Sequence, residues 1–312
     1  MSNKIKKDIT ASVHQRLLNN ARGSGRPFQE VLQYYAMERF LYRLSKTGYR
    51  DRFILKGALL FSVWQVPGSR PTRDIDLLGR IDNSLDTIVA AVKEICLVTV
   101  VPDGIIFDAE SIEGARIVEG AEYQGVRIQF RGNLGRTRLT MQLDIGFGDT
   151  VVPSVTLRDF PTVLDLPAPR LKIYSRESLV AEKFEAMVSL GLLNSRMKDF
   201  YDIGFLSRHF SFDGQTLAKA IVKTFSNRNT EIPSDLSSLL TSLGNESAKH
   251  TQWSGFLRKA RLQGSSADFN EVLAGIDVFL GPITKAIAAE LPFQQTWRAP
   301  GPWSTEMDDL EH

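Results

Sequence analysis

The stretch Thr72-Arg73-Asp74-Ile75-Asp76-Leu77-Leu78 places two aspartates one residue apart at the start of a short apolar run. If residues 74–78 form a β-strand, Asp74 and Asp76 lie on the same face, because side chains alternate between the two faces of a strand. Two neighbouring carboxylates repel each other unless a cation lies between them. Carboxylate oxygens suit Mg²⁺, which proteins often share with substrate phosphates. The stretch therefore predicts a site for Mg²⁺ or Mn²⁺.

A small-residue turn lies upstream of this stretch. Gly57-Ala58 follows the apolar segment 52–55, predicted to be a strand, and opens a segment predicted to be a helix. Backbone N–H groups in such a turn can approach phosphate oxygens, so we expect Gly57 and Ala58 to bind nucleotide. Thr72 is expected either to cap its own loop or to take part in nucleotide binding.

A third aspartate strengthens the prediction, because an Asp-x-Asp pair alone is a weak signal and most such pairs are exposed strand acids. Asp144 has apolar neighbours on both sides in Met141-Gln142-Leu143-Asp144-Ile145-Gly146. A carboxylate in an apolar strand is costly unless it is paired or bound to a metal. We therefore expect Asp144 either to be paired or to be a third metal ligand, beside Asp74 and Asp76.

The hydrophobic pattern predicts an α+β protein of two parts. Residues 1–165 are expected to form a mixed sheet with flanking helices, including N-terminal helices over 9–21 and 27–48 and hairpins over 114–147. Residues 166–309 are expected to form a mainly helical domain, with helices over 178–190, 196–210, 213–225 and 271–290. The last three residues, 310–312, are set aside as a cloning remnant.

The helical half carries a second group of charged residues. Lys183 lies on a predicted helix that is apolar at Leu179, Val180, Phe184 and Met187. It either reaches inward as a cation for phosphate or is an exposed lysine beside Glu182. Asp199 and Asp202 are three residues apart and share one face of the next predicted helix. This acidic pair either marks the start of a helix, organises Lys183 or orients a substrate hydroxyl as a general base does.

These segments resemble the abortive-infection AbiEii-type nucleotidyltransferase toxins. The resemblance spans about residues 16–210 and rests on four motifs: Leu55-Lys56-Gly57-Ala58-Leu59, Arg70-Pro71-Thr72-Arg73-Asp74-Ile75-Asp76-Leu77, Leu179-Val180-Ala181-Glu182-Lys183 and Arg196-Met197-Lys198-Asp199-Phe200-Tyr201-Asp202-Ile203. The family usually has Gly or Ser where this chain has Ala58, so a hydroxyl that could contact phosphate is missing here. The resemblance implies the nucleotidyltransferase fold, with two-metal chemistry on a nucleoside triphosphate (NTP).

The resemblance also implies the reaction and its partners. It points to a toxin that transfers nucleotides from NTP to an RNA acceptor, the 3′ end of tRNA, and so blocks translation. Asp74, Asp76, Lys183, Asp199 and Asp202 are then the catalytic residues, with Lys183 also on the nucleotide. A cognate antitoxin is an expected partner, and phosphate placed on Thr72 in some relatives makes that residue a regulatory candidate. Nucleotidylation of a protein or small-molecule hydroxyl, and a non-catalytic nucleic-acid-binding or antitoxin module, remain the alternatives.

Composition limits the other classes of protein. The chain has 312 residues, a formal net charge of +2 and a single cysteine, which excludes an internal disulfide and a thiolate zinc cluster. No leader or membrane span is recognisable, so a cytoplasmic location is expected. A basic N-terminal segment and Arg127, Arg131, Arg136 and Arg138 suit a polyanion such as RNA, and surface solubility explains them equally well.

Overall fold

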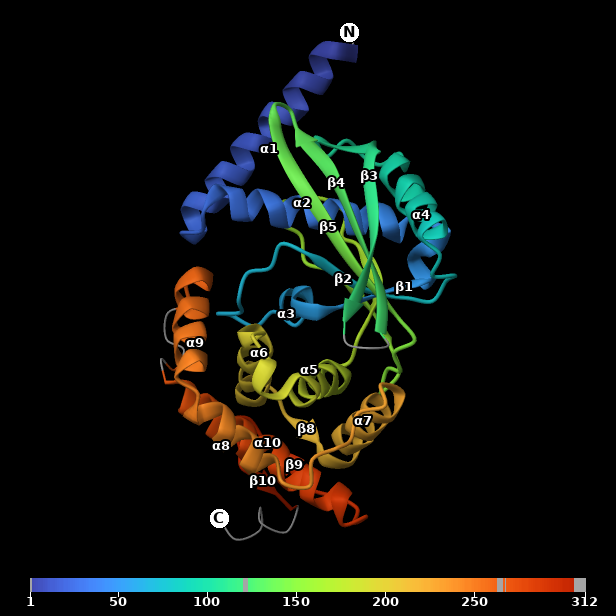
Figure 1. Ribbon diagram of the computed structural model, residues 1–312. Coiled ribbons are helices and arrows are strands. Elements are labelled where there is room, and N and C mark those ends of the chain that lie inside the picture. The colour runs from blue at the N-terminus through green and yellow to red at the C-terminus, as the bar shows by residue number, and fades with distance from the viewer. Residues whose placement is uncertain (1, 120–122, 263–265, 267, 306–312) are drawn as a thin grey trace. The chain divides into compact units, whose positions relative to one another are not determined.

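The computed structural model describes residues 2–119, 123–262, 266 and 268–305 (Figure 1). The chain forms two compact units. Unit 1 comprises Met1–Gln65, Pro71–Gly148 and Thr156–Ile173, and unit 2 comprises Val66–Arg70, Asp149–Val155 and Tyr174–His312. Two short segments that interrupt the sequence of unit 1 thus pack with unit 2, so no single point in the chain divides the units.

Unit 1 contains a mixed seven-stranded sheet in the order β3-β4-β5-β2-β1-β7-β6. β2 runs parallel to β5 and β1 runs parallel to β7, while the other neighbours are antiparallel. The strands are β1 (Phe53–Lys56), β2 (Ile75–Gly79), β3 (Ile105–Glu119), β4 (Tyr123–Leu134), β5 (Thr137–Phe147), β6 (Thr156–Asp159) and β7 (Arg170–Ile173). The predicted hairpins are confirmed as β3, β4 and β5. The predicted strand 74–78 begins at Ile75, so Asp74 lies in the bend before it.

Helices cover one face of this sheet. α2 contacts β5, and α4 contacts β3 and β4. Alternate residues of β5 (Leu139, Met141, Leu143 and Ile145) are buried, whereas Arg138 and Thr140, in the alternating positions, are exposed. This period of two gives the sheet one apolar face and one polar face. The helical segments of unit 1 are α1 (Ser2–Ser24), α2 (Phe28–Ser45), η1 (Gly48–Asp51), η2 (Gly57–Leu59), α3 (Leu60–Val63) and α4 (Leu85–Leu97).

Unit 2 is mainly helical. Its elements are α5 (Arg176–Leu190), η3 (Gly191–Leu193), α6 (Met197–His209), β8 (Phe212–Asp213), α7 (Gly214–Asn227), α8 (Leu236–Asn245), α9 (Ser247–Ala260), α10 (Phe269–Ala288), β9 (Thr296–Trp297) and β10 (Trp303–Ser304). Several helices begin at a polar residue whose side chain accepts a backbone N–H bond, as at Ser175 and Asp213. The predicted α+β class, a mixed sheet followed by helices, is confirmed.

None of the described helices is both long and apolar enough to cross a membrane. Residues 310–312, set aside from the sequence, lie outside the described part of the chain, as do the side chains of Lys4, Lys6 and Lys7 in the basic N-terminal segment.

Candidate active site

A row of four charged residues crosses the centre of the sheet in unit 1. Lys56 on β1 is paired in register with Asp76 on β2, Asp76 with Asp144 on β5, and Asp144 with Arg127 on β4. Residues paired in register point to the same face of a sheet. Four neighbouring strands therefore present a row with two carboxylates in the middle and a cation at each end.

Gly57 lies directly against one of these carboxylates. Its φ is +71°, a conformation that glycine adopts without strain. A Cβ atom built on Gly57 would lie 2.0 Å from Oδ2 of Asp76 and 2.6 Å from its Cγ. The absence of a side chain at Gly57 therefore makes room for the Asp76 carboxylate. The sequence predicted a nucleotide-binding role for Gly57, and the structure adds that this glycine sets the position of Asp76.

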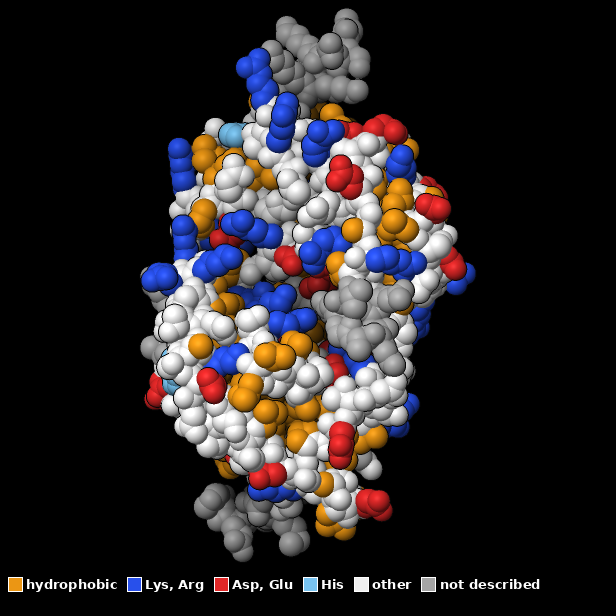
Figure 2. Space-filling view, viewed as in Figure 1, with side chains coloured by type: hydrophobic (Ala, Val, Ile, Leu, Met, Phe, Trp, Pro, Cys, Tyr) orange, Lys and Arg blue, Asp and Glu red, His pale blue; other side chains and the backbone are white. Residues whose placement is uncertain are grey.

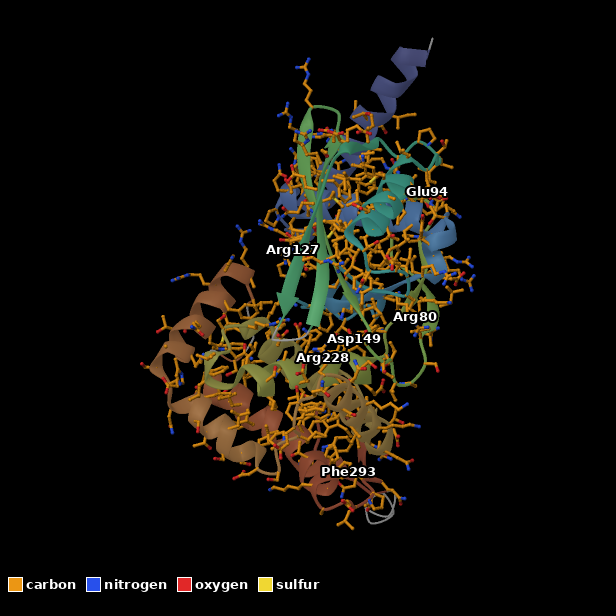
Figure 3. The ribbon with its side chains drawn as sticks, turned by 45° about the vertical axis from the view of Figure 1, so that its right-hand side comes forward. Arg80, Glu94, Arg127, Asp149, Arg228 and Phe293 are labelled. Carbon is orange, nitrogen blue, oxygen red and sulfur yellow. The ribbon has the colours of Figure 1, made fainter. Side chains whose placement is uncertain are left out.

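Asp144 has an arginine partner. Arg127 Nε and an Arg127 terminal nitrogen donate to the two carboxylate oxygens at 2.8 and 2.7 Å, and Gln142 donates to them at 3.4 and 3.3 Å. Such a two-pronged ion pair is strong and directional. Figure 3 labels Arg127 beside the strands of the sheet. The expectation that this strand carboxylate is paired or metal-bound is met by Arg127, for which an RNA contact and a role in surface solubility were the expected alternatives.

Asp74 is held by its own loop. Its Oδ1 accepts hydrogen bonds from the Thr72 hydroxyl at 3.3 Å and from the Arg73 backbone N–H at 3.1 Å. The Gln33 side chain on α2 donates to the backbone carbonyls of Arg73 and Thr140 at 3.4 and 3.1 Å. These two bonds link the loop to β5. Ala58 is buried in the turn after β1. Thr72 thus lies within reach of the Asp74 carboxylate, as its position in the sequence suggested.

The carboxylates of unit 1 fit a divalent cation shared with a substrate. Among the described residues, no three side chains of His, Cys, Asp or Glu gather closely enough to hold a metal without other ligands. Mg²⁺ commonly takes only one or two protein carboxylates and completes its shell with water and substrate phosphates. Asp74 and Asp76 stay the predicted pair of hard oxygen ligands. Asp144 stays a predicted third ligand, with Arg127 as its partner.

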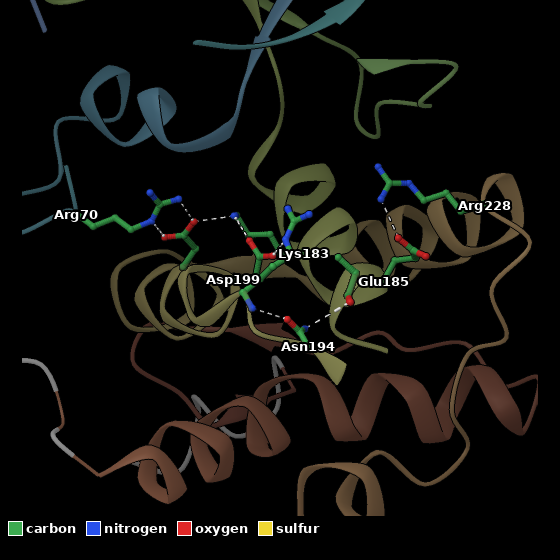
Figure 4. A network of polar contacts seen from close by, with 9 residues as sticks. Arg70, Lys183, Glu185, Asn194, Asp199 and Arg228 are labelled. Atoms are coloured by element: carbon green, nitrogen blue, oxygen red, sulfur yellow. Dashed lines mark hydrogen bonds and ion pairs between the residues drawn. The ribbon is translucent and has the colours of Figure 1, made fainter. Parts of the chain in front are cut away.

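A second polar cluster lies in unit 2 (Figure 4). Lys183 Nζ on α5 lies 2.8 Å from Oδ1 of Asp199 and 2.6 Å from Oδ2 of Asp202, both on α6. Arg70 donates to the two oxygens of Asp202 at 2.8 Å each, and Arg196 Nε donates to Asp199 at 2.7 Å. The structure thus brings together the three residues predicted in this half. An exposed Lys183 beside Glu182, the alternative interpretation, is wrong, because Lys183 is 8% exposed.

Lys183, Asp199 and Asp202 are buried, and neighbouring charges shift the pKa values of Lys183 and Asp199. Burial alone would lower the pKa of Lys183, but the neighbouring charges of Asp199 and Asp202 outweigh it and raise that pKa. Burial likewise opposes ionisation of Asp199, and Lys183 and Arg196 outweigh it and hold the pKa of Asp199 well below its usual range. Three cations and two carboxylates therefore stabilise one another, with Lys183 and both carboxylates buried and the Arg196 side chain 34% exposed.

Sequence reasoning missed the structural role of Arg70. This residue stands in the motif quoted above, but nothing in its local sequence indicates a partner 132 residues away. Arg70 ends the segment Val66–Arg70, and the backbone carbonyl of Gly68 in the same segment accepts a bond from the Tyr201 hydroxyl at 3.0 Å. The segment that leads into the Asp74 loop is therefore fastened to α6.

A third cluster, also missed, fastens the other short segment of unit 2. Arg228 lies 3.1 Å from Asp149, 2.8 Å from Glu185 and 3.8 Å from Glu182, and Figure 3 labels Arg228 next to Asp149. The backbone N–H of Val152 donates to the Ser178 hydroxyl at 2.7 Å. Both short segments of unit 2 that interrupt the sequence of unit 1 are thus held by side chains from the rest of unit 2.

A mixed sheet that carries an Asp-x-Asp strand after a glycine turn, followed by helices, is consistent with a nucleotidyltransferase fold. The family model described as "Nucleotidyl transferase AbiEii toxin, Type IV TA system" matches residues 39–275. This match covers well over half of the chain, and the protein therefore belongs to the AbiEii nucleotidyltransferase toxin family of type IV toxin–antitoxin systems. A comparison with curated proteins found no match.

A solved structure shares the fold. The crystal structure of JHP933 from Helicobacter pylori aligns with a TM-score of 0.50 and 16% sequence identity, over 84% of this chain and 94% of that one. A second H. pylori structure, named provisionally as a nucleotidyltransferase, aligns with a TM-score of 0.48 and 16% identity, over 85% of this chain and 99% of that one. At this identity, the likeness to JHP933 concerns the fold alone.

Proposed function

We propose that this protein transfers a nucleotidyl group from an NTP to the 3′ hydroxyl of an RNA, with tRNA as the acceptor class that the family resemblance implies. The observation that supports it most is the placement of Asp76 against Gly57 and in register with Asp144. A glycine that makes room for one particular carboxylate is expected where that carboxylate has to approach a ligand closely.

The reaction balances without a redox partner. The acceptor hydroxyl oxygen attacks the α-phosphorus of the NTP, a new P–O bond forms, and the bond to the β-phosphate oxygen breaks to release pyrophosphate. The hydroxyl proton passes to a base, for which the carboxylates of Asp76 and Asp144 are the candidates in unit 1. From unit 2, Lys183 is proposed as a phosphate contact that Asp199 and Asp202 hold in place.

A divalent cation fits this chemistry. Asp74 and Asp76, with Asp144 as the third candidate, are the residues that would hold Mg²⁺ or Mn²⁺. When bound, the ion neutralises charge on the triphosphate and lowers the pKa of a coordinated hydroxyl. The remaining work falls on the protein itself: Gly57 keeps Asp76 in position, and Arg127 orients Asp144.

The acceptor class is tested by offering both candidates to the same enzyme. Each α-³²P-labelled NTP is incubated with the protein and total RNA, and separately with total cell protein. Label in RNA of tRNA size supports the proposal, and label in protein supports the alternative acceptor. Absence of transfer to either would favour the non-catalytic alternative.

The toxin role needs a test in cells. Induced wild-type protein is expected to slow growth and reduce incorporation of labelled amino acids, whereas Asp74→Ala at equal soluble level is expected to do neither. Equal growth of the two strains would contradict the proposal that this chain blocks translation. Relief of the growth defect by a co-expressed neighbouring gene product would identify the antitoxin.

A further inference from the structure

The polar face of the β4–β5 hairpin is exposed and basic. We name this surface the basic ribbon and define it by residues that alternate along the two strands and by Arg136 in the turn between them. Its strand members are Arg127, Gln129, Arg131 and Asn133 on β4, with their register partners Asp144, Gln142, Thr140 and Arg138 on β5. The ribbon begins at the row formed by Lys56, Asp76, Asp144 and Arg127, which we name the carboxylate row, and it ends at the hairpin turn.

The ribbon offers several cations to solvent. Arg131, Arg136 and Arg138 are exposed. In the described part of the chain, Arg136 and Arg138 have no ion-pair partner, and Arg131 pairs with Asp108 of β3 at 3.0 Å while its side chain stays 63% exposed. Figure 2 shows Lys and Arg side chains over the region where β4 and β5 run in Figure 1. Asp144 is the one acidic member, and Arg127 neutralises it.

The chemistry of the ribbon favours a polyanion over a protein partner. Protein interfaces usually have an apolar core, and none of the large exposed hydrophobic residues found in the described part of the chain lies on β4 or β5. Surfaces that bind nucleic acid are more polar and more positively charged. Arginine and amide side chains are the groups that contact phosphate and sugar oxygens.

The geometry of the ribbon connects this chemistry to the proposed reaction. Arg138 lies six positions before Asp144 on β5, which places Arg138 about 20 Å along the strand from the carboxylate row. We infer that the basic ribbon holds the phosphate backbone of the acceptor RNA and leads its 3′ end to the carboxylate row. This inference deepens the proposed function and rests on it for the identity of the acceptor.

The test removes the two unpaired arginines. Arg136→Ala/Arg138→Ala is compared with Arg80→Ala/Arg158→Ala, a control that removes two exposed arginines elsewhere in unit 1. Arg80 follows β2, and Figure 3 labels it well apart from Arg127, while Arg158 lies on β6 at the opposite edge of the sheet. Binding of fluorescein-labelled total tRNA to the full chain is measured across a range of salt concentrations, and binding of a fluorescent NTP analogue is measured separately.

We expect the ribbon variant to bind tRNA about tenfold more weakly at ~0.1 M salt. The logarithm of the association constant should also fall less steeply with the logarithm of the salt concentration, by about 1.5 in the slope, because each lost phosphate contact removes about 0.7–0.9. The control variant should match the wild type, and NTP binding should be unchanged in all three proteins. Equal tRNA binding by the ribbon and control variants would overturn the inference, as would a wild-type protein that binds no tRNA.

The same assay separates the inference from the proposed function. If tRNA binding depends on the ribbon but no nucleotide is transferred to RNA, the inference stands and the proposed reaction fails. If tRNA is labelled equally well by the ribbon and control variants at limiting tRNA, the reaction stands and the inference fails.

Discussion

Gly57 and Asp76 share a space that only one side chain can occupy. A Cβ atom at Gly57 would lie 2.0 Å from the Asp76 carboxylate, although the two residues belong to different strands and turns of the chain. Lys56, the residue before Gly57, is the register partner of Asp76, so strand pairing itself brings the turn to the carboxylate. The glycine motif and the Asp-x-Asp motif are therefore one structural feature.

This relationship predicts that Gly57→Ala abolishes transfer by displacing Asp76. Gly25→Ala is the matched control, because Gly25 also has a positive φ, +68°, but a Cβ atom there would have no neighbour within 4 Å. Both variants carry a backbone strain of about 1–2 kcal/mol. The transfer rate and the thermal unfolding of both variants are measured. Transfer should be lost only in Gly57→Ala. Equal activities would mean that Asp76 does not need this space.

Lys183 is expected to contribute to the stability of the fold as well as to nucleotide binding. Lys183→Met leaves Asp199 and Asp202 buried with less compensating charge, which should lower the free energy of unfolding by about 3–5 kcal/mol. Lys219→Met, at an exposed position on α7 outside the cluster, should change it by under about 1 kcal/mol. Chemical denaturation of the three proteins measures this. An unfolding free energy unaffected by Lys183→Met would show that the buried cluster does not form.

Glu38 on α2 should make stability depend on pH. Burial raises the pKa of this carboxyl from 4.5 to about 7, against the opposing charge of Arg39. Between these values the unfolded chain releases the proton that the folded chain retains, so this group's contribution to stability falls as pH rises from about 4.5 to 7. The loss is on the order of 3 kcal/mol, at about 1.4 kcal/mol per pKa unit.

Glu38→Gln tests this assignment, because the amide oxygen can still accept the bond from the Val163 N–H, which is 2.6 Å in the native protein. As the pH rises from 4.5 to 7, the free energy of unfolding of the wild type should fall relative to that of Glu38→Gln. A difference that stays constant over this range would refute the raised pKa of Glu38.

Thr72 is proposed as a site where phosphorylation inhibits the transfer reaction, because its hydroxyl lies 3.3 Å from the Asp74 carboxylate. A phosphate there would bring nearly two negative charges beside Asp74 and compete for the metal. Thr72→Glu should lose transfer at saturating Mg²⁺ and NTP, and Thr72→Val should keep much of it. Thr156→Glu, on exposed β6, controls for the added charge. A fully active Thr72→Glu would remove the basis for regulation at this position.

The sequence was sufficient for the elements whose signals are local. Alternation between polar and apolar residues predicted the hairpins of β4 and β5, and apolar spacing predicted α5 and α6. The short strands β6 and β7 were missed because four residues in a Pro-rich region carry too little periodicity to be recognised. α8 was missed because its Ser-rich sequence has the composition of a loop.

The candidate site was predictable in its acids and less so in its partners. An aspartate inside an apolar strand indicates by itself that something must compensate it, so Asp144 was found from its neighbours. Its partner Arg127 lies 17 residues away, and the partner of Asp202, Arg70, lies 132 residues away. Such pairs depend on strand register and helix packing, which one sequence does not specify.

The proposed reaction depends on the Asp76 carboxylate. Its most direct test is the transfer from α-³²P-labelled NTP to total tRNA by Asp76→Asn. This variant keeps the size of the side chain and removes its charge. Asp159→Asn, an exposed acid on β6 of the same sheet, is the control. We predict Mg²⁺- or Mn²⁺-dependent labelling by wild type and Asp159→Asn, and a loss of at least about a thousandfold in Asp76→Asn with unchanged thermal unfolding. Labelling of tRNA at the wild-type rate by a folded Asp76→Asn protein would show that the reaction does not need the Asp76 carboxylate.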